Sequence, residues 1–298
     1  MRLFGFGKDP EIQLAEEHAK ARREASQANI EQGGLPLEAI DRLTEQASKQ
    51  GTNRHFFTSD LSVNELSVVH QAGYEPLGQV MGSSVYHVGR QWGLGTSWGT
   101  QEMTVLSHAY SEARRLAFGR LLQEAALLGA DGVVGVRLER KKAGWDSDLI
   151  EFIAIGTAVR GNARTNGNAA PFVSSLSGVD FLMLRKSGFT PVAFAFGNCS
   201  YACVSSYNRF SWVNQEITDL TQAVYEARGS AMQRMESEAR AHKAENVVGV
   251  TIETEMEVIE RDKMPPLTLI HFTAFGTGIA SFKTDSPTIP FQMAVSLG

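Results

Sequence analysis

The stretch GADGVVGVRLE, residues 129–139, returns 114 positions later as KAENVVGVTIE, residues 243–253. After the shared Val-Val-Gly-Val, apolar and polar side chains alternate, which is typical of a strand with one buried face. Gly129, which precedes the first of these strands, is expected to end a helix as its C-cap. A glycine inside a strand indicates that a neighbour lies too close for a side chain. The stretch therefore predicts a helix-to-strand junction that the chain uses twice.

The repetition extends well beyond this stretch. Residues 57–88 align without a gap on residues 172–203, and residues 98–139 align on residues 212–253. Such self-similarity indicates two copies of one structural unit. Identical residues at matched positions include Gly73 and Gly188, Gly82 and Gly197, Tyr86 and Tyr201, Trp98 and Trp212, Arg114 and Arg228, Arg120 and Arg234, and Glu124 and Glu238. We divide the chain into an N-terminal helical extension (1–55), a first domain (56–160), a linker (161–170), a second domain (171–281) and a C-terminal tail (282–298).

Composition excludes several classes of protein. With 298 residues and 43% hydrophobic side chains, the chain is long enough for about two domains with substantial cores. A formal net charge of −5 argues against a general nucleic-acid-binding protein, because phosphate contacts need clustered Lys and Arg. Two cysteines are too few for a disulfide framework, and the apolar run at the start of the sequence is too short for a signal peptide. No apolar run approaches the roughly 18–20 residues that cross a bilayer, so we expect a cytoplasmic protein without a transmembrane segment.

Each copy predicts the same order of elements: a short helix, a long strand or hairpin, a long helix and two strands. Ser59 and Ser174 are candidate N-caps of the short helix. In the long helix, apolar residues recur at a spacing of three and four, and paired alanines allow close packing on a sheet. The expected elements are short helices at 63–72 and 178–187, strands or hairpins at 74–88 and 189–204, long helices at 103–128 and 217–239, and closing strands at 149–159 and 267–279. Two further helices are expected at 8–32 and 35–47.

The closing strands, LIEFIAIGTAV (149–159) and LTLIHFTAFGTGI (267–279), are apolar on both faces. A strand without a polar face has to be covered on both sides, and one long helix covers one side of a small sheet. Contacts between domains or between subunits would cover the other side. The predicted fold class is therefore α+β, with two tandem domains, each a small antiparallel or mixed sheet packed on one long helix, after an N-terminal helical extension.

Several stretches together resemble the YbjQ-like family, whose name describes a heavy-metal-binding domain. They are Gly78–Gly82 (GQVMG), Glu112–Arg114, Glu124-Ala125, Leu128–Val136 and Gly156–Val159 in the first copy, and the second copy departs at Lys243, Asn246 and Gly278. The resemblance covers about residues 56–160 and 171–281. It implies small α+β domains that form ring-shaped oligomers, typically pentamers, so that five such chains would give a ring of ten domains. It implies heavy-metal binding by name, without a ligand motif that carries over residue by residue.

Three residues are candidate metal ligands: Cys199, Cys203 and His87. On an extended strand, residues four apart are separated by roughly 13 Å, whereas each thiolate on a shared zinc forms a bond of about 2.3 Å. The cysteines could share a metal only if the chain folds back at 197–200; otherwise they are small buried apolar residues. A site assembled across subunits stays open, and a divalent heavy metal is the one candidate cofactor.

Both copies keep Trp-x-x-Gln-Glu directly before the long helix, at Trp98 and Trp212, with Trp92 and Phe210 nearby. The tryptophans either pack over the start of the helix or form an aromatic surface for a partner or a neighbouring subunit. Two further residues common to both copies, Arg114 and Arg228, are expected in a structural or intersubunit salt bridge, with anion binding as the alternative.

The sequence lacks several common catalytic patterns, among them Gly-x-Gly-x-x-Gly, the P-loop and His-Glu-x-x-His. We therefore expect no enzyme. The favoured function is a non-catalytic assembly or binding protein that forms a ring with further copies of itself, with another protein as a further candidate partner and no nucleic acid. The alternative is a protein that binds a heavy or transition metal.

Overall fold

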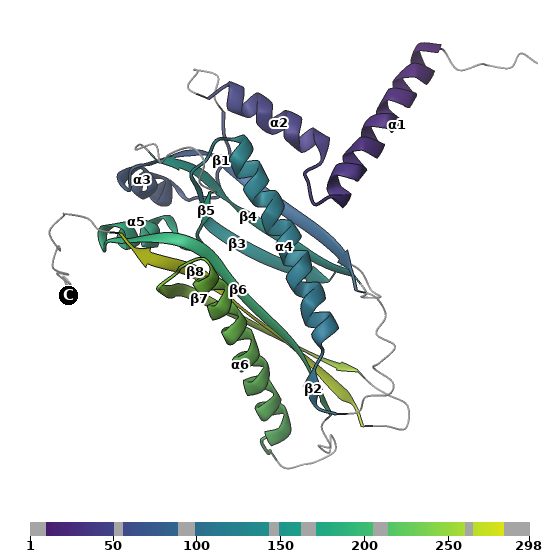
Figure 1. Cartoon of the computed structure of the whole chain (residues 1–298), viewed down its shortest axis with the longest axis vertical. Helices are drawn as coiled ribbons and strands as arrows, with labels where there is room; N and C mark the ends of the chain where they lie inside the picture. The colour runs from purple at the N-terminus through teal and green to yellow at the C-terminus, as the bar shows by residue number, and fades with distance from the viewer. Residues whose placement is uncertain are drawn as a thin grey trace, which may run out of the picture.

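The structure, a computed structural model of the chain, describes residues 10–50, 56–88, 99–142, 149–161, 171–204, 214–259 and 265–282. It contains two four-stranded sheets, each packed on one long helix, and two helices that precede them (Figure 1). This arrangement confirms the predicted α+β class with two tandem domains and an N-terminal helical extension. Among the described helices, none combines the length and the apolar character that a membrane crossing requires.

The elements follow the predicted order in both copies. The extension holds α1 (Pro10–Glu31) and α2 (Leu37–Ser48). The first copy contains α3 (Val63–Gln71), β1 (Tyr74–His87), β2 (Gln101–Glu102), α4 (Thr104–Leu127), β3 (Gly132–Lys142) and β4 (Leu149–Gly161). The second copy contains β5 (Phe172–Val173), α5 (Gly178–Lys186), β6 (Phe189–Val204), α6 (Thr218–Ala241), β7 (Asn246–Ile259) and β8 (Leu267–Ser281).

The two sheets exchange short edge strands, which the sequence did not predict. The first sheet has the order β1-β4-β3-β5, so that β5 of the second copy lies parallel to β3 of the first. The second sheet has the order β2-β6-β8-β7, so that β2 of the first copy pairs with β6 of the second. Apart from β3 with β5, every strand pair among the described residues is antiparallel. The two domains are therefore joined by backbone hydrogen bonds in both directions.

The short helices begin where they were predicted, but their N-caps lie three residues after the predicted ones. Ser62 caps α3 and forms a capping box with Glu65, and Ser177 caps α5. The hydroxyl of Ser59, the residue predicted for this role, lies instead 3.0 Å from the hydroxyl of Thr157 on β4. Ser174 makes the matching contact in the second copy, 3.3 Å from the hydroxyl of Thr277. The predicted caps are thus wrong, and these serines anchor the segment before each helix to the closing strand.

The long helices lie directly on strands β1 and β6, α4 on β1 and α6 on β6. A Cβ added at Gly82 would lie 1.9 Å from the carbonyl oxygen of Ala117, and one at Gly197 would lie 1.9 Å from that of Ala231. Because those oxygens belong to the helix backbone, no side-chain movement would relieve the clash. The repeated glycines and alanines therefore set the distance between helix and sheet. Residues 74–87 and 189–204 each form one continuous strand rather than a hairpin.

The mid-strand glycines of the repeated Val-Val-Gly-Val motif adopt a backbone conformation that other residues rarely adopt, in addition to allowing close packing. Gly135 and Gly249 have φ angles of 64° and 60°, and the register of each strand shifts at that point. A bulge of this kind favours glycine, since left-handed φ values strain other residues. Gly129 has a φ of 67° after α4, as a C-cap requires, whereas the second copy places Lys243 there with a φ of 62°.

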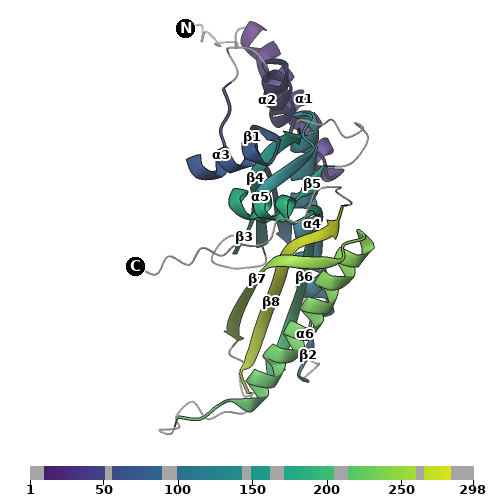
Figure 2. The same ribbon diagram turned by 90° about the vertical axis from the view of Figure 1, so that its left-hand side faces the viewer.

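The domains stack as alternating layers, with α4 between the two sheets. The backbone of α4 touches β1 on one side, while Phe118 packs on Phe194 of β6 on the other, with ring centroids 4.4 Å apart. Figure 2 shows α6 along the opposite face of the second sheet. Strand β8 is therefore buried from residue 267 to residue 279, covered by α6 and by the first domain, as its two apolar faces predicted.

Candidate assembly interface

An ion pair at the edge of β6 fastens the two domains together. The guanidinium of Arg114, on α4, donates to both carboxylate oxygens of Glu238, on α6, over 2.8 and 2.9 Å. Its central carbon lies 4.5 Å from the ring centroid of Phe196. Glu238 also accepts the backbone N–H of Phe196 over 3.0 Å. The two charged side chains are 14% and 25% exposed, so the pair is largely removed from water and gains from charge-assisted geometry.

Polar groups fix the register of α4 on β6. Asn198 donates its amide N–H to the carbonyl oxygen of Ser107 over 2.9 Å, and Ser111 donates its hydroxyl to the amide oxygen of Asn198 over 2.7 Å. The backbone N–H of Ser200 donates to the hydroxyl of Ser107 over 2.9 Å. These buried hydrogen bonds demand one alignment of helix and strand, because a shift would leave the same groups without partners.

Apolar contacts fill the space between the layers. The ring of Phe194 lies between Phe118 and Phe275, with centroid distances of 4.4 and 5.6 Å. Val136 and Leu138 of β3 are 2% and 7% exposed and belong to the same core cluster as these rings. The cluster joins both domains, so the interface resembles a protein interior rather than a contact between separate surfaces.

The contacts define two complementary faces. The donor face is the surface of the first domain: Ser107, Tyr110, Arg114, Phe118, Val136 and Leu138. The acceptor face is the surface of the second domain: Phe194, Phe196, Asn198, Ser200, Glu238 and Phe275. The alignment of the two copies identifies the equivalent positions in the other domain, and strand pairing with β1 and β6 extends it to β4 and β8. The second domain therefore also has a donor face, and the first domain also has an acceptor face; among the described residues, neither contacts the other domain of the same chain. The free donor face of the second domain comprises Thr221, Val224, Arg228, Met232, Val250 and Ile252. The free acceptor face of the first domain comprises Gln79, Met81, Ser83, Val85, Glu124 and Ile155.

The free faces expose apolar side chains that their counterparts bury. Met81 is 47% exposed where Phe196 is 3% exposed. Val250 and Ile252 are 40% and 48% exposed where Val136 and Leu138 are buried. Farther along β7, on the same side of the sheet, Met256 and Val258 are also exposed. Apolar side chains gathered in this way are typical of an interaction surface.

Glu124 and Glu238, which the sequence alignment pairs, hold equivalent places, and the sequence did not predict either of them as an interface residue. Glu124 accepts the backbone N–H of Met81 over 2.8 Å, as Glu238 does for Phe196. Burial raises the pKa of Glu124, while the Met81 N–H and the guanidinium of Arg42 act in the opposite direction. A glutamate kept in both copies on the buried side of a helix was the available signal, because an unpaired buried carboxylate is costly.

The structure separates the two arginines that the sequence paired. Arg114 forms a salt bridge between domains, whereas Arg228 is exposed on α6. Glu102, which lies directly before α4, pairs with Arg234 over 2.7 Å, across the domain boundary. The predicted aromatic residues Trp92, Trp98, Phe210 and Trp212 lie outside the described residues.

The candidate metal donors do not come together within the described chain. Cys199 and Cys203 are buried on β6, which pairs with β8 in unbroken register from residue 193 to residue 204, so the strand does not fold back between them. Burial raises the pKa of Cys199 to about 11, which keeps the thiol protonated at neutral pH. His87 is exposed on the other sheet, at the end of β1. No group of three His, Cys, Asp or Glu suited to a metal occurs among the described residues, so this donor set does not fit a heavy-metal site.

Comparison with known proteins gives three matches. The YbjQ_1 family model, described as "Putative heavy-metal-binding", matches residues 70–162 and 210–280. The encapsulin nanocompartment protein Rv1762c of Mycobacterium tuberculosis is 47% identical over 205 residues, which cover 65% of this chain and 76% of that protein. A UPF0145 protein of Clostridium perfringens is 38% identical over 58 residues, which cover 20% of this chain and 53% of that protein.

Proposed function

Since this chain belongs to the YbjQ-like family and carries two copies of its domain, we propose that it is a non-catalytic assembly protein whose chains join head to tail into a closed ring. We propose further that this ring is a component of an encapsulin nanocompartment. The first proposal extends the predicted ring-forming oligomer, and the second follows from the relative of 47% identity whose name places it in such a compartment.

One observation carries the assembly proposal: the chain contains a complete donor–acceptor interface and, in addition, one free copy of each face. Arg228 occupies the place of Arg114, and Glu124 occupies the place of Glu238. A free donor face that fits the free acceptor face of another chain produces a heterologous contact, which repeats until the assembly closes. Each added contact would bury apolar residues such as Ile252 and Met81, which the single chain leaves exposed.

Edge strands support the same geometry. Within the chain, the segment before α5 runs along β3, where Ser174 donates its N–H to the carbonyl oxygen of Val133 over 2.9 Å. The counterpart of β3 is β7, the last strand of its sheet among the described residues. The segment before α3 of the next chain, around Ser59, would lie along β7 in the same way. Backbone pairing of this kind adds specificity for an edge of the right register.

Metal binding is not proposed for this chain. The family description names it, yet the described cysteines are buried, protonated at neutral pH and held apart on one strand. The proposed assembly role rests on the donor and acceptor faces, which contact each other between the two domains of this chain.

The test reverses one charge on the free donor face. Arg228→Glu would place a carboxylate next to Glu124 of the neighbouring chain, and we expect the concentration of half-assembly to rise at least tenfold in native mass spectra and light scattering. Arg240→Glu is the matched control, because Arg240 lies on the same helix with its side chain 75% exposed and pairs with Glu236. Equal assembly of the two variants would contradict the proposal. The mass of the intact ring would give the number of chains, with five expected.

The compartment proposal has its own test. The chain would be produced together with the encapsulin shell protein of the same organism, and the shells would be separated on a density gradient. We expect the wild-type chain to travel with the shells. Recovery only in the light fractions, as free protein, would contradict this part of the proposal and leave the ring untouched.

A further inference from the structure

The N-terminal extension contacts the free acceptor face at the two charged groups that mark it. At the interface between domains, Glu238 receives Arg114 from α4. In the first domain the equivalent Glu124 receives Arg42 from α2, with the guanidinium nitrogen 3.2 Å from the carboxylate. A helix of the extension thus supplies the cation that a neighbouring domain supplies elsewhere in the same chain.

The second group is the arginine one turn earlier on the long helix. Arg120 and Arg234 each donate to a carbonyl oxygen of their own sheet over 2.6 Å, at Ser83 and Asn198. Their remaining N–H groups differ. Arg234 pairs with Glu102 of the preceding domain, whereas Arg120 donates to the carbonyl oxygens of Gly34 and Ile30, both over 3.1 Å.

From this correspondence, which rests on the proposed function, we propose that the N-terminal extension is a self-cap. It covers the edge of the free acceptor face at Glu124 and Arg120, and it competes there with the donor face of the next chain. Arg42 stands where Arg228 of that chain would lie, and the turn at Ile30–Gly34 stands where its Glu216 would lie. Glu124 has one carboxylate for two competing guanidinium groups, so a chain joins the ring at this face after α2 has moved away.

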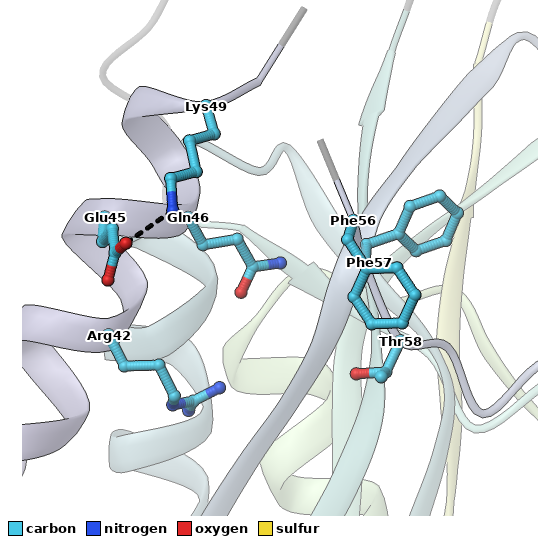
Figure 3. A pocket seen from close by; sticks show the side chains of 7 residues that line it. All are labelled: Arg42, Glu45, Gln46, Lys49, Phe56, Phe57 and Thr58. Atoms are coloured by element: carbon cyan, nitrogen blue, oxygen red, sulfur yellow. Dashed lines mark hydrogen bonds and ion pairs between the residues drawn. The ribbon is translucent and has the colours of Figure 1, made fainter. Parts of the chain in front are cut away.

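The way α2 is attached suits a removable cap. Leu43 is fully buried and Leu35 nearly so, both within the core cluster that contains α4. Gln46 adds a hydrogen bond from its side chain to the carbonyl oxygen of Leu77 over 3.1 Å. The rest of the contact is incomplete, because a pocket of about 310 Å³ separates α2 from the segment that precedes α3 (Figure 3). In that pocket the side chain of Lys49 pairs with Glu45 of its own helix.

The first helix offers little to hold the cap in place. Nearly every residue of α1 is exposed, and Figure 1 shows it standing away from both sheets. Its contacts include the salt bridge from Arg22 to Glu38 of α2 and, at its last turn, the hydrogen bond from Arg120 of α4 to the carbonyl oxygen of Ile30. Release of α2 requires the contacts around Leu43, Arg42 and Gln46 to break, together with the hydrogen bonds of Gln50 to Leu128 and Arg160 and the contacts of the turn after α1.

The experiment releases the cap in the full chain. Leu43→Asp places a charge at the buried centre of the α2 contact, and Thr44→Asp is its control at the adjacent exposed position. We expect Leu43→Asp to lower the concentration of half-assembly at least tenfold, measured by light scattering and native mass spectrometry, with Thr44→Asp unchanged. Limited proteolysis within α1 and α2 reports release independently. Should Leu43→Asp misfold by circular dichroism, Arg42→Glu, which repels Glu124, takes its place with the same expectation.

Combining variants separates the two proposals. Leu43→Asp with Arg228→Glu should return to single chains, because the released face then lacks its matching donor. If Arg228→Glu disrupts the ring but release of α2 leaves assembly unchanged, the self-cap is overturned and the ring stands. Weaker assembly after release overturns it too, because the extension would then be part of the contact. Single chains in every variant would overturn the ring and the self-cap together.

Discussion

The two domains share their sequence pattern but differ in what their surfaces touch. Arg114 is locked between α4 and β6, whereas Arg228 is exposed on α6. Phe196 lies beneath a guanidinium, whereas Met81 meets solvent. Each domain was built from one pattern, and its position in the chain decided which face became an interior. The comparison teaches that a surface residue found in both copies, such as Arg114 and Arg228, can have different contacts in each copy.

The substitutions between the copies follow this difference. The permanent acceptor face carries Phe194 and Phe196, and the free one carries Gln79 and Met81 at the same positions. A smaller and more polar surface is what a face needs if it spends time in water, whereas an obligate contact resembles a core. We therefore expect the contact between chains to be weaker than the contact between domains.

The largest effect on stability should come from the close contact between the long helix and the sheet, which is the same in both domains. Gly197→Ala would place a Cβ 1.9 Å from the carbonyl oxygen of Ala231, and we expect α6 to be pushed off its sheet at a cost of about 3 kcal/mol or more. Gly229→Ala is the control, since nothing lies within 4 Å of its Cβ and helix propensity alone should stabilise the protein by about 0.5–1 kcal/mol. Urea unfolding followed by circular dichroism measures both. A mild Gly197→Ala variant would show that the helix is free to shift.

A smaller effect should separate Arg114 from its exposed neighbour on the same helix. Arg114→Ala leaves the Glu238 carboxylate without its cation at a largely buried place, and we expect a loss of about 2 kcal/mol. Arg115, 65% exposed and paired with Glu112 within the helix, should cost less than about 0.5 kcal/mol when replaced by Ala. Equal losses in urea unfolding would mean that the domain contact depends on its apolar cluster alone.

The smallest expected effect is a dependence of stability on pH that arises from Cys199, a residue that only the second copy has. Burial, followed by the charge of Glu102, raises the pKa of Cys199 from its ordinary 9.0 to about 11, whereas the first copy has Ser84 at this position. A raised folded pKa means that the stability contributed is complete below pH 9 and is lost as pH rises through 11. Between pH 8 and pH 10 the wild type should lose about 1 kcal/mol more than Cys199→Ala. Parallel pH profiles for the two proteins would exclude this assignment.

Much of the fold followed from the sequence because its signals are local. The apolar stripe of α4, the C-cap at Gly129 and the two-sided strand β8 each depend on a short run of residues, and the structure confirms them. The N-cap was misplaced at Ser59 because two serines precede α3. The presence of Glu65 three residues after Ser62 would have decided between them, since a capping box needs that spacing.

The candidate interface was less accessible to sequence reasoning. Strands β2 and β5 have two residues each, too few for any periodic pattern. A salt bridge was expected for Arg114 and Arg228, but which faces meet depends on how the domains pack, so the sequence could not tell one arginine from the other. The same limit applies to the ion pair between Arg42 and Glu124, because the two residues are 82 positions apart in the sequence.

The covalent link between β4 and β5 has a consequence for how a ring would come apart. Every second contact in the proposed ring lies within one chain, where the linker keeps the partner domain at an effective concentration on the order of millimolar. Dilution therefore acts only on the contacts between chains. As the protein concentration falls, the ring should break into two-domain pieces, and an isolated single domain should not appear before the chain itself unfolds.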